Sequence, residues 1–234
     1  MKKNLILLCA LALVLLLIIC GRFLLPRRTG MAIDYIVKHF PFTKNSSLTE
    51  WEEKIFKGKV VYTVEGPGGD ESYVKAESKK TASALFYKVN LDVKKHPVIS
   101  WKWRVEKFPE KKLPEQISLK KEEDFAARIY VIFPAAFFTH SKVVEYIWAE
   151  ELPVGTSDSS AYSKNIKMMV LRSGRHEEKW FFEERDIYAD YVALFGKKPR
   201  LNIGAIAFMT DADSTKTEAT SFYDEIKIGY KGED

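Results

Sequence analysis

The stretch VISWKWRV, residues 98 to 105, alternates apolar and polar side chains with a period of two residues. Successive side chains of a β-strand point to opposite faces, so this period is typical of a strand with one buried face. The apolar face carries Ile99, Trp101, Trp103 and Val105, and the other face carries Ser100, Lys102 and Arg104. We therefore expect a strand whose two tryptophans lie in a hydrophobic core.

A second stretch, DFAARIYVIF at residues 124 to 133, has the same period. Its apolar face carries Phe125, Ala127, Ile129, Val131 and Phe133, and its other face carries Asp124, Ala126, Arg128, Tyr130 and Ile132. Further strands are expected at residues 60–64, 72–78, 142–148, 166–172, 179–184, 202–209 and 222–230. Residues 186–196 have helical spacing and end at Gly196. The sequence therefore predicts an all-β, antiparallel β-sandwich with one short helix.

The N-terminus is an apolar leader. Residues 5–20 contain no polar side chain and follow Lys2 and Lys3, which is typical of a secretory signal or an N-terminal membrane anchor. Residues 23–25 lengthen the run when Arg22 lies at the membrane interface. We expect a hydrophobic helix that contacts the membrane through residues 5–25, in a chain exported to the periplasm and anchored to the inner membrane. A cleaved leader and a lipidated one are the alternatives.

The chain therefore divides into three parts. Residues 1–28 are the signal or anchor segment, residues 29–50 a juxtamembrane spacer, and residues 51–230 a single β-sandwich domain. Within the spacer, MAIDYIVKHF at residues 31–40 has the pattern of a short amphipathic helix ended by Pro41.

The excess positive charge lies in the leader. Five of the 37 basic residues fall in residues 1–28, which contain no acid, so 32 basic residues remain against 32 acidic ones. A neutral domain lacks the basic surface that phosphate backbones require, which excludes nucleic acid as a partner. Cys9 and Cys20 also lie in the leader, which excludes disulfides, zinc thiolate sites and cysteine nucleophiles from the domain.

The segment FMTDADSTKTEATSFYDEIKIGY, residues 208 to 230, contains Asp211, Asp213 and Asp224. Carboxylate and hydroxyl oxygens at alternate positions suit calcium. A helix-loop-helix calcium site is excluded, because Lys216 and Phe222 stand where that loop needs glycine and glutamate. A structural calcium site of another kind, held by the three aspartates, is the metal hypothesis; a capped polar turn is the alternative.

Polar residues at strand positions form the second candidate site, which consists of Arg104, Asp124, Arg128, Tyr130, Glu183 and Arg185. Guanidinium groups and carboxylates suit hydroxyl-rich or acidic ligands, and Tyr130 offers a stacking surface. Cross-strand ion pairs, or a buried structural network, explain the same pattern without a ligand.

Catalytic signatures are sparse. Asp124 and Glu183 are candidates for the carboxylate pair of a polysaccharide hydrolase or lyase, although separation in sequence fixes no distance between them. The four histidines have no metal-ligand spacing, and no nucleophile, zinc or phosphate-binding motif is present. The sequence assigns no catalytic residue.

Several separated motifs carry a family resemblance. They are SALFYKV (83–89), WKWRV (101–105), DFAARIYVIF (124–133), YIWAEELPVGT (146–156), MMVLRSG (168–174), WFFEERDIYADYVALFG (180–196), IAFMTDADST (206–215) and YDEIKIG (223–229). Together they resemble a family of exported bacterial proteins of unknown function, over about residues 51 to 230.

The family pattern is similar to the jelly-roll, galactose-binding-like sandwiches of carbohydrate-binding modules. This resemblance implies an envelope protein whose domain binds a glycan or another polar ligand without catalysis. It also implies that Asp224, in the closing strand, matches an aspartate of a structural calcium site. A polysaccharide-acting enzyme and an assembly factor for an envelope complex remain alternatives.

Overall fold

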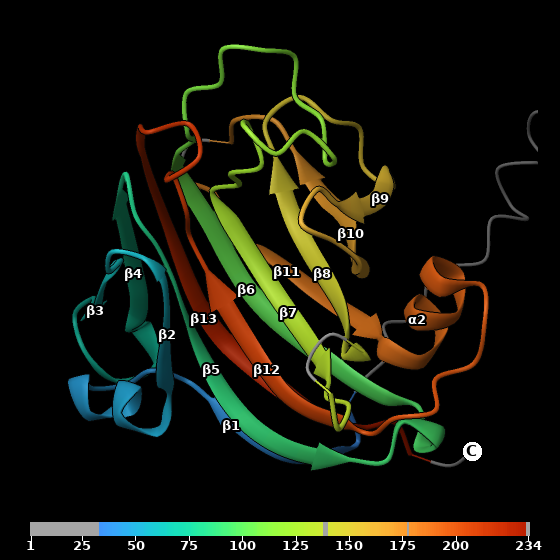
Figure 1. Cartoon of the computed structure of the whole chain (residues 1–234). Helices are drawn as coiled ribbons and strands as arrows, with labels where there is room; N and C mark the ends of the chain where they lie inside the picture. The colour runs from blue at the N-terminus through green and yellow to red at the C-terminus, as the bar shows by residue number, and fades with distance from the viewer. Residues whose placement is uncertain (1–32, 138–139, 177, 233–234) are drawn as a thin grey trace, which may run out of the picture. The chain divides into compact units, whose positions relative to one another are not determined.

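The computed structural model describes residues 33–137, 140–176 and 178–232, and these form two packed β-sheets (Figure 1). Sheet A contains β1 (Tyr35–Phe40), β3 (Val61–Glu65), β4 (Tyr73–Lys79), β6 (Pro97–Lys107), β11 (Phe181–Asp186) and β13 (Glu218–Tyr230). Sheet B contains β2 (Glu52–Lys57), β5 (Ala82–Leu91), β7 (Ala127–Phe133), β8 (Lys142–Ala149), β9 (Ser157–Ser160), β10 (Ser163–Ser173) and β12 (Ile203–Met209). The expected β-sandwich is confirmed.

The strand order is β11-β6-β13-β4-β3 in sheet A, with β1 also paired to β13, and β2-β5-β12-β7-β8-β10-β9 in sheet B. The strand pairs of the described chain are antiparallel with one exception, the parallel pair of β8 and β10. A parallel pair requires a crossover of a dozen or more residues. Residues 150–162, which include β9, supply that connection, so the sandwich is mostly antiparallel, as expected, and departs from that expectation at this pair.

The core lies between the two sheets and is rich in aromatic residues. Trp101 and Trp103 of β6 are fully buried, as their position in the period-two pattern predicts. Trp101 stacks on Tyr146 of β8 with ring centroids 5.4 Å apart, and Trp103 lies 5.6 Å from Trp148. These pairs join sheet A to sheet B, so the tryptophans act as packing residues.

Residues 35–40 differ from the sequence expectation. They form strand β1, which pairs with the second half of β13, so the helix expected at residues 31–40 is wrong over this range. Phe40 and Phe42 then enter the core and contact Trp51. The unpaired edge of β13 decides the outcome, because ladder hydrogen bonds to a neighbouring strand outweigh a weak helical period. The folded domain therefore includes residues that the sequence assigns to a spacer.

The short 3-10 helices are η1 (Asn45–Glu50), η2 (Gly69–Glu71) and η3 (Val93–Lys95). The expected α-helix is present as α2 (Ile187–Phe195). Asp186 caps its N-terminus by accepting a hydrogen bond from the backbone N–H of Ala189 at 2.9 Å, and Gly196 ends it in the left-handed conformation. The Tyr146 hydroxyl donates to Asp190 at 2.7 Å, which ties the helix to sheet B.

The described residues contain no helix with the length and apolarity needed to span a membrane. The expected N-terminal hydrophobic helix at residues 5–25 lies outside the described residues.

Candidate functional site

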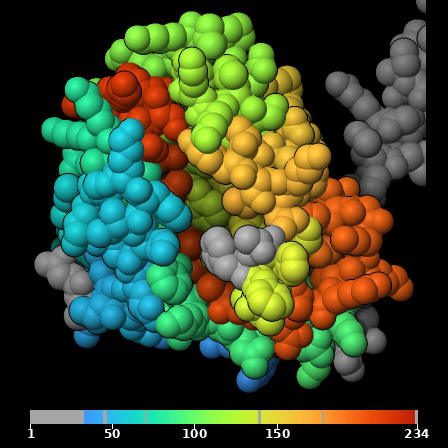
Figure 2. Space-filling view, in the orientation of Figure 1, coloured from blue at the N-terminus to red at the C-terminus, as the bar shows by residue number. Residues whose placement is uncertain are grey.

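The side of sheet B that faces away from sheet A is hollowed, with the rim formed by β2 and by the loops around β9 and before β7 (Figure 2). Strand register places Phe86 of β5, Ala207 of β12, Tyr130 of β7 and Glu145 of β8 in one row across this surface. Phe86 and Tyr130 are half-buried, whereas Ala207 and Glu145 are buried. The short Ala207 side chain lies between the two aromatic residues in this row.

Arg128 lies beside this row and is buried in an ion-pair network. Its Nε and Nη2 donate to the two oxygens of Asp211 at 2.8 Å each, and its Nη1 donates to Glu145 Oε1 at 2.7 Å. Nη2 also donates to the backbone carbonyl of Glu123 at 2.5 Å. Arg128 is 3% exposed, so its guanidinium is engaged by internal acceptors rather than presented to solvent.

The acids around Arg128 have raised pKa values. Burial raises the pKa of Asp211 well above its usual range, and the Arg128 guanidinium opposes this shift. Burial raises the pKa of Glu145 to about 6, while Arg128 and a hydrogen bond from Tyr130 lower it. Burial also raises the pKa of Tyr130. Desolvation therefore makes the largest contribution to the pKa shift of each group, and the positive charge of Arg128 stabilises the buried carboxylates.

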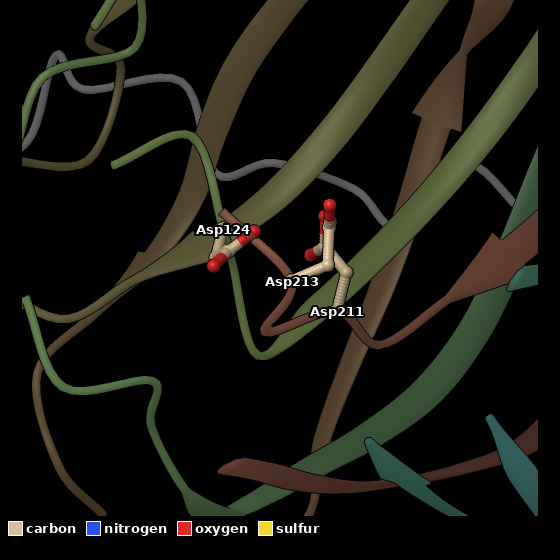
Figure 3. Close-up of side chains that lie close together, drawn as sticks. All are labelled: Asp124, Asp211 and Asp213. Carbon is tan, nitrogen blue, oxygen red and sulfur yellow. The ribbon is translucent and has the colours of Figure 1, made fainter. Parts of the chain in front are cut away.

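Three aspartates gather at one end of sheet B. The carboxylate oxygens of Asp124, Asp211 and Asp213 lie within 4.8 Å of one another. Figure 3 shows Asp124 in the segment before β7 and the other two in the segment after β12. Asp124 accepts hydrogen bonds from the backbone N–H groups of Ser214 at 3.2 Å and Thr215 at 2.7 Å. Asp124 therefore holds the loop that carries its two neighbours.

These partners bear on the calcium hypothesis. Both oxygens of Asp211 bind Arg128, and both oxygens of Asp124 accept backbone N–H groups. Asp213 lies 3.6 Å from the Lys57 ammonium group. The positive charge that the cluster needs is thus supplied by side chains, and a calcium ion would compete with the Arg128 guanidinium. The calcium site stays a prediction, and the donor set fits it poorly.

Asp224 is not part of this cluster. It lies on β13 in sheet A opposite Lys102, whose Nζ is 4.0 Å from its carboxylate. A β-bulge follows, with Glu225 at a φ of 52°, and reverses the parity before Ile226. Asp224 and Ile226, although two positions apart, therefore lie on opposite faces of β13. Burial raises the pKa of Asp224 to about 6, and its Oδ1 has no hydrogen-bond partner in the described residues.

Glu183 and Arg185 lie on β11, in sheet A, and each has its own partner. Glu183 forms an ion pair with Arg172 and accepts a hydrogen bond from Trp103 Nε1 at 3.3 Å. Arg185 forms an ion pair with Asp190 of α2. The suggested catalytic pair of Asp124 and Glu183 thus consists of two carboxylates with separate sets of partners.

Arg104 lies on the outer side of sheet A, opposite Phe222 of β13. It therefore does not share a face with Arg128, and the expected combined face is wrong. The reason is that the period of two fixes the side of a strand on which each arginine lies, but not the sheet to which the strand belongs.

Two residues of the row were not predicted from the sequence. Glu145 is the one acid in the apolar run KVVEYIW, and a carboxylate at such a position needs a buried partner. An acid within an apolar strand therefore predicts a buried basic partner, and Arg128 is that partner of Glu145. Phe86 lies within SALFYKV, and its parity gave no reason to separate it from the core aromatics.

The family model described as "Protein of unknown function (DUF3047)" matches residues 49–227. The chain belongs to this family. This range is close to residues 51 to 230, over which the sequence resembles a family of unknown function. No curated protein matches the chain.

Solved structures similar to this DUF3047 member have diverse roles. A family 11 carbohydrate-binding module of Clostridium thermocellum has 11% identity and a TM-score of 0.41, covering 79% of this chain and 90% of the module. The xyloglucanase domain of NopAA from Sinorhizobium fredii has 10% identity and a TM-score of 0.43, covering 77% and 93%. An adhesin domain of Lys-gingipain from Porphyromonas gingivalis has 11% identity and a TM-score of 0.41, covering 83% and 98%. Similarity of this degree transfers no function.

Proposed function

We propose that the domain binds a glycan in the hollow over sheet B, without chemical turnover. The observation that carries this proposal is the row of Phe86, Ala207 and Tyr130 across the hollowed face. A sugar ring presents an apolar C–H face and a rim of hydroxyl groups, and aromatic side chains bind the C–H face while polar tips bind the rim. In this proposal the two rings flank the sugar, and the short Ala207 side chain gives it room.

The charged groups beside this row support binding rather than catalysis. Glu145 and Asp211 are held by Arg128, and Asp124 is held by the loop after β12. A general acid or nucleophile must reach the scissile bond, whereas Glu145 is 2% exposed. These carboxylates fix the floor of the site and the orientation of the Tyr130 hydroxyl.

The test is binding of the full-length chain to an array of envelope and plant-type oligosaccharides, followed by titration of each hit. Tyr130→Ala removes one aromatic ring of the row, and we expect at least about tenfold weaker binding, since stacking and hydrogen-bond contributions are each about 1 kcal/mol. Tyr35→Ala is the matched control, because Tyr35 is 67% exposed on β1. Unchanged binding in Tyr130→Ala would overturn the location, and the absence of any glycan hit would overturn the function.

Two alternatives have their own readouts in the same experiment. A polysaccharide hydrolase or lyase that uses Asp124 and Glu183 would release products from the array polymers, and that release would be lost in Asp124→Asn. An assembly factor would bind no glycan and would instead crosslink to one envelope protein.

A jelly-roll, galactose-binding-like arrangement of the strands and a periplasmic location complete the proposal. Envelope glycans are accessible to this domain only after export, and residues 5–25 would anchor it to the inner membrane. Protease added to intact spheroplasts should digest the domain, whereas protection would place it on the cytoplasmic side.

A further inference from the structure

Arg104 differs from the arginines of the described residues that form ion pairs. Carboxylates bind the guanidinium groups of Arg128, Arg172, Arg175 and Arg185. Arg104 is half-buried and forms neither an ion pair nor a hydrogen bond within the described residues, and its Nε is buried without a partner. A buried donor without an acceptor costs free energy, so this group calls for an explanation.

Aromatic rings hold the Arg104 guanidinium in place. Its central carbon lies 3.8 Å from the ring centroid of Phe222 and 5.7 Å from that of Trp180. Tyr73 lies 5.5 Å from both of these rings. Phe222 is buried beneath this group, whereas Trp180 and Tyr73 are half-buried. We name the four residues Arg104, Phe222, Trp180 and Tyr73 the outer platform, because they lie on the side of sheet A that faces away from sheet B.

A guanidinium that is stacked and unpaired is suited to bind an oxyanion. Its donors form a planar fork that matches the two oxygens of a carboxylate or phosphate. Stacking fixes the side chain in advance, so little rotamer entropy is lost when the anion binds. The nearest acid along β13, Asp224, faces Lys102 across the strand pair. Arg104 is thus left as the free cation of the outer platform.

We propose that the outer platform binds a saccharide that carries a carboxylate or a phosphate. Arg104 binds the oxyanion and Trp180 stacks on the sugar ring, with the exposed Lys102 ammonium group adding positive charge at one side. The site lies on the sheet opposite to the hollow, and it stands independently of the function proposed there.

The experiment is calorimetric titration of the full-length chain in detergent with two pairs of ligands. Trigalacturonate is compared with neutral galactotriose, and glucose 6-phosphate with glucose. We expect one acidic member to bind and its neutral partner to bind at least about tenfold more weakly, because a charge-assisted bidentate contact is lost. The arm that responds distinguishes a carboxylate ligand from a phosphate ligand. Binding should also weaken as salt is added.

Variants separate the outer platform from general charge effects and from the hollow. Arg104→Gln should weaken acidic-ligand binding at least about tenfold, and Arg104→Lys should restore only part of it, since lysine keeps the charge without the fork. Lys107→Gln removes one charge from the same strand, where Lys107 pairs with Glu218, and should leave binding within about twofold. Tyr130→Ala should also leave it unchanged, whereas a loss there would assign the acidic ligand to the hollow.

Equal affinity for acidic and neutral sugars overturns the proposal, and so does acidic-ligand binding that survives Arg104→Gln. Failure of both acidic sugars to bind the unaltered chain also overturns it and leaves Arg104 as a packing residue. If Arg104→Gln fails to fold, Trp180→Leu decides, because it removes the stacking ring and keeps the cation.

Discussion

Arg104 and Arg128 each follow an inward-facing residue on a central strand, Trp103 on β6 and Ala127 on β7. Arg128 is covered and binds two carboxylates, whereas Arg104 stacks on Phe222 and binds none in the described residues. The difference arises from the residues that surround each side chain. Arg128 is surrounded by acids and covered by loops, whereas Arg104 lies against aromatic rings. A polar position on a strand therefore indicates a side chain that leaves the core, but its surroundings decide whether it serves stability or binding.

The largest effect expected from this comparison is on stability. Arg128→Met leaves Asp211 and Glu145 buried without their cation, and breaking a buried pair in this way costs about 3 to 5 kcal/mol of unfolding free energy. Arg104→Met, the matched control, removes no ion pair and should cost about 1 kcal/mol or less. Urea denaturation of both variants at pH 7 measures the difference. Similar losses in the two variants would contradict the assignment of different roles.

Asp224 allows a second, smaller test on the sheet that carries Arg104. Burial raises its pKa from the usual 3.8 to about 6, so the folded state binds the proton more tightly than the unfolded state. The ionised carboxylate therefore destabilises the fold above pH 6, and this cost disappears as the pH falls to about 4. Asp224→Asn should raise the unfolding free energy by about 2 kcal/mol at pH 7 and leave it unchanged near pH 4. Urea midpoints at the two pH values measure it.

The control for this prediction is Glu218→Gln, which removes an exposed acid from the same strand. A surface ion pair contributes about 0 to 1 kcal/mol, so this variant should be slightly destabilised at pH 7. A destabilised Asp224→Asn would show instead that the carboxylate has an attractive partner in the folded protein.

The period of two was sufficient to predict the strands around Trp101 and Ile129. It also predicted the burial of Trp101 and Trp103. It could not predict which strands share a sheet, because hydrogen bonding between distant segments decides that. The same limit explains three differences: Arg104 and Arg128 on separate sheets, β1 in place of a helix, and the parallel pair of β8 and β10.

Local insertions set a further limit on what the sequence could predict. One extra residue at the bulge after Asp224 reverses the face of the side chains that follow, so parity counted through it fails. The clustering of Asp211 and Asp213 was expected from their spacing. Asp124 joined them only because β7 and β12 are neighbours, and Asp224 was excluded because β13 belongs to the other sheet.

The smallest expected effect concerns calcium at the aspartate cluster. Arg128 binds both oxygens of Asp211, so a calcium ion must displace a guanidinium to gain that ligand. A ligand raises the melting temperature substantially only when its dissociation constant for the folded state is well below its working concentration. We expect 2 mM calcium, compared with EDTA, to shift the melting temperature of the full-length chain by less than about 2 °C, the equivalent of at most about 1 kcal/mol. A larger rise that is lost in Asp213→Asn would contradict this prediction and would mean that the cation, rather than Arg128, neutralises the cluster.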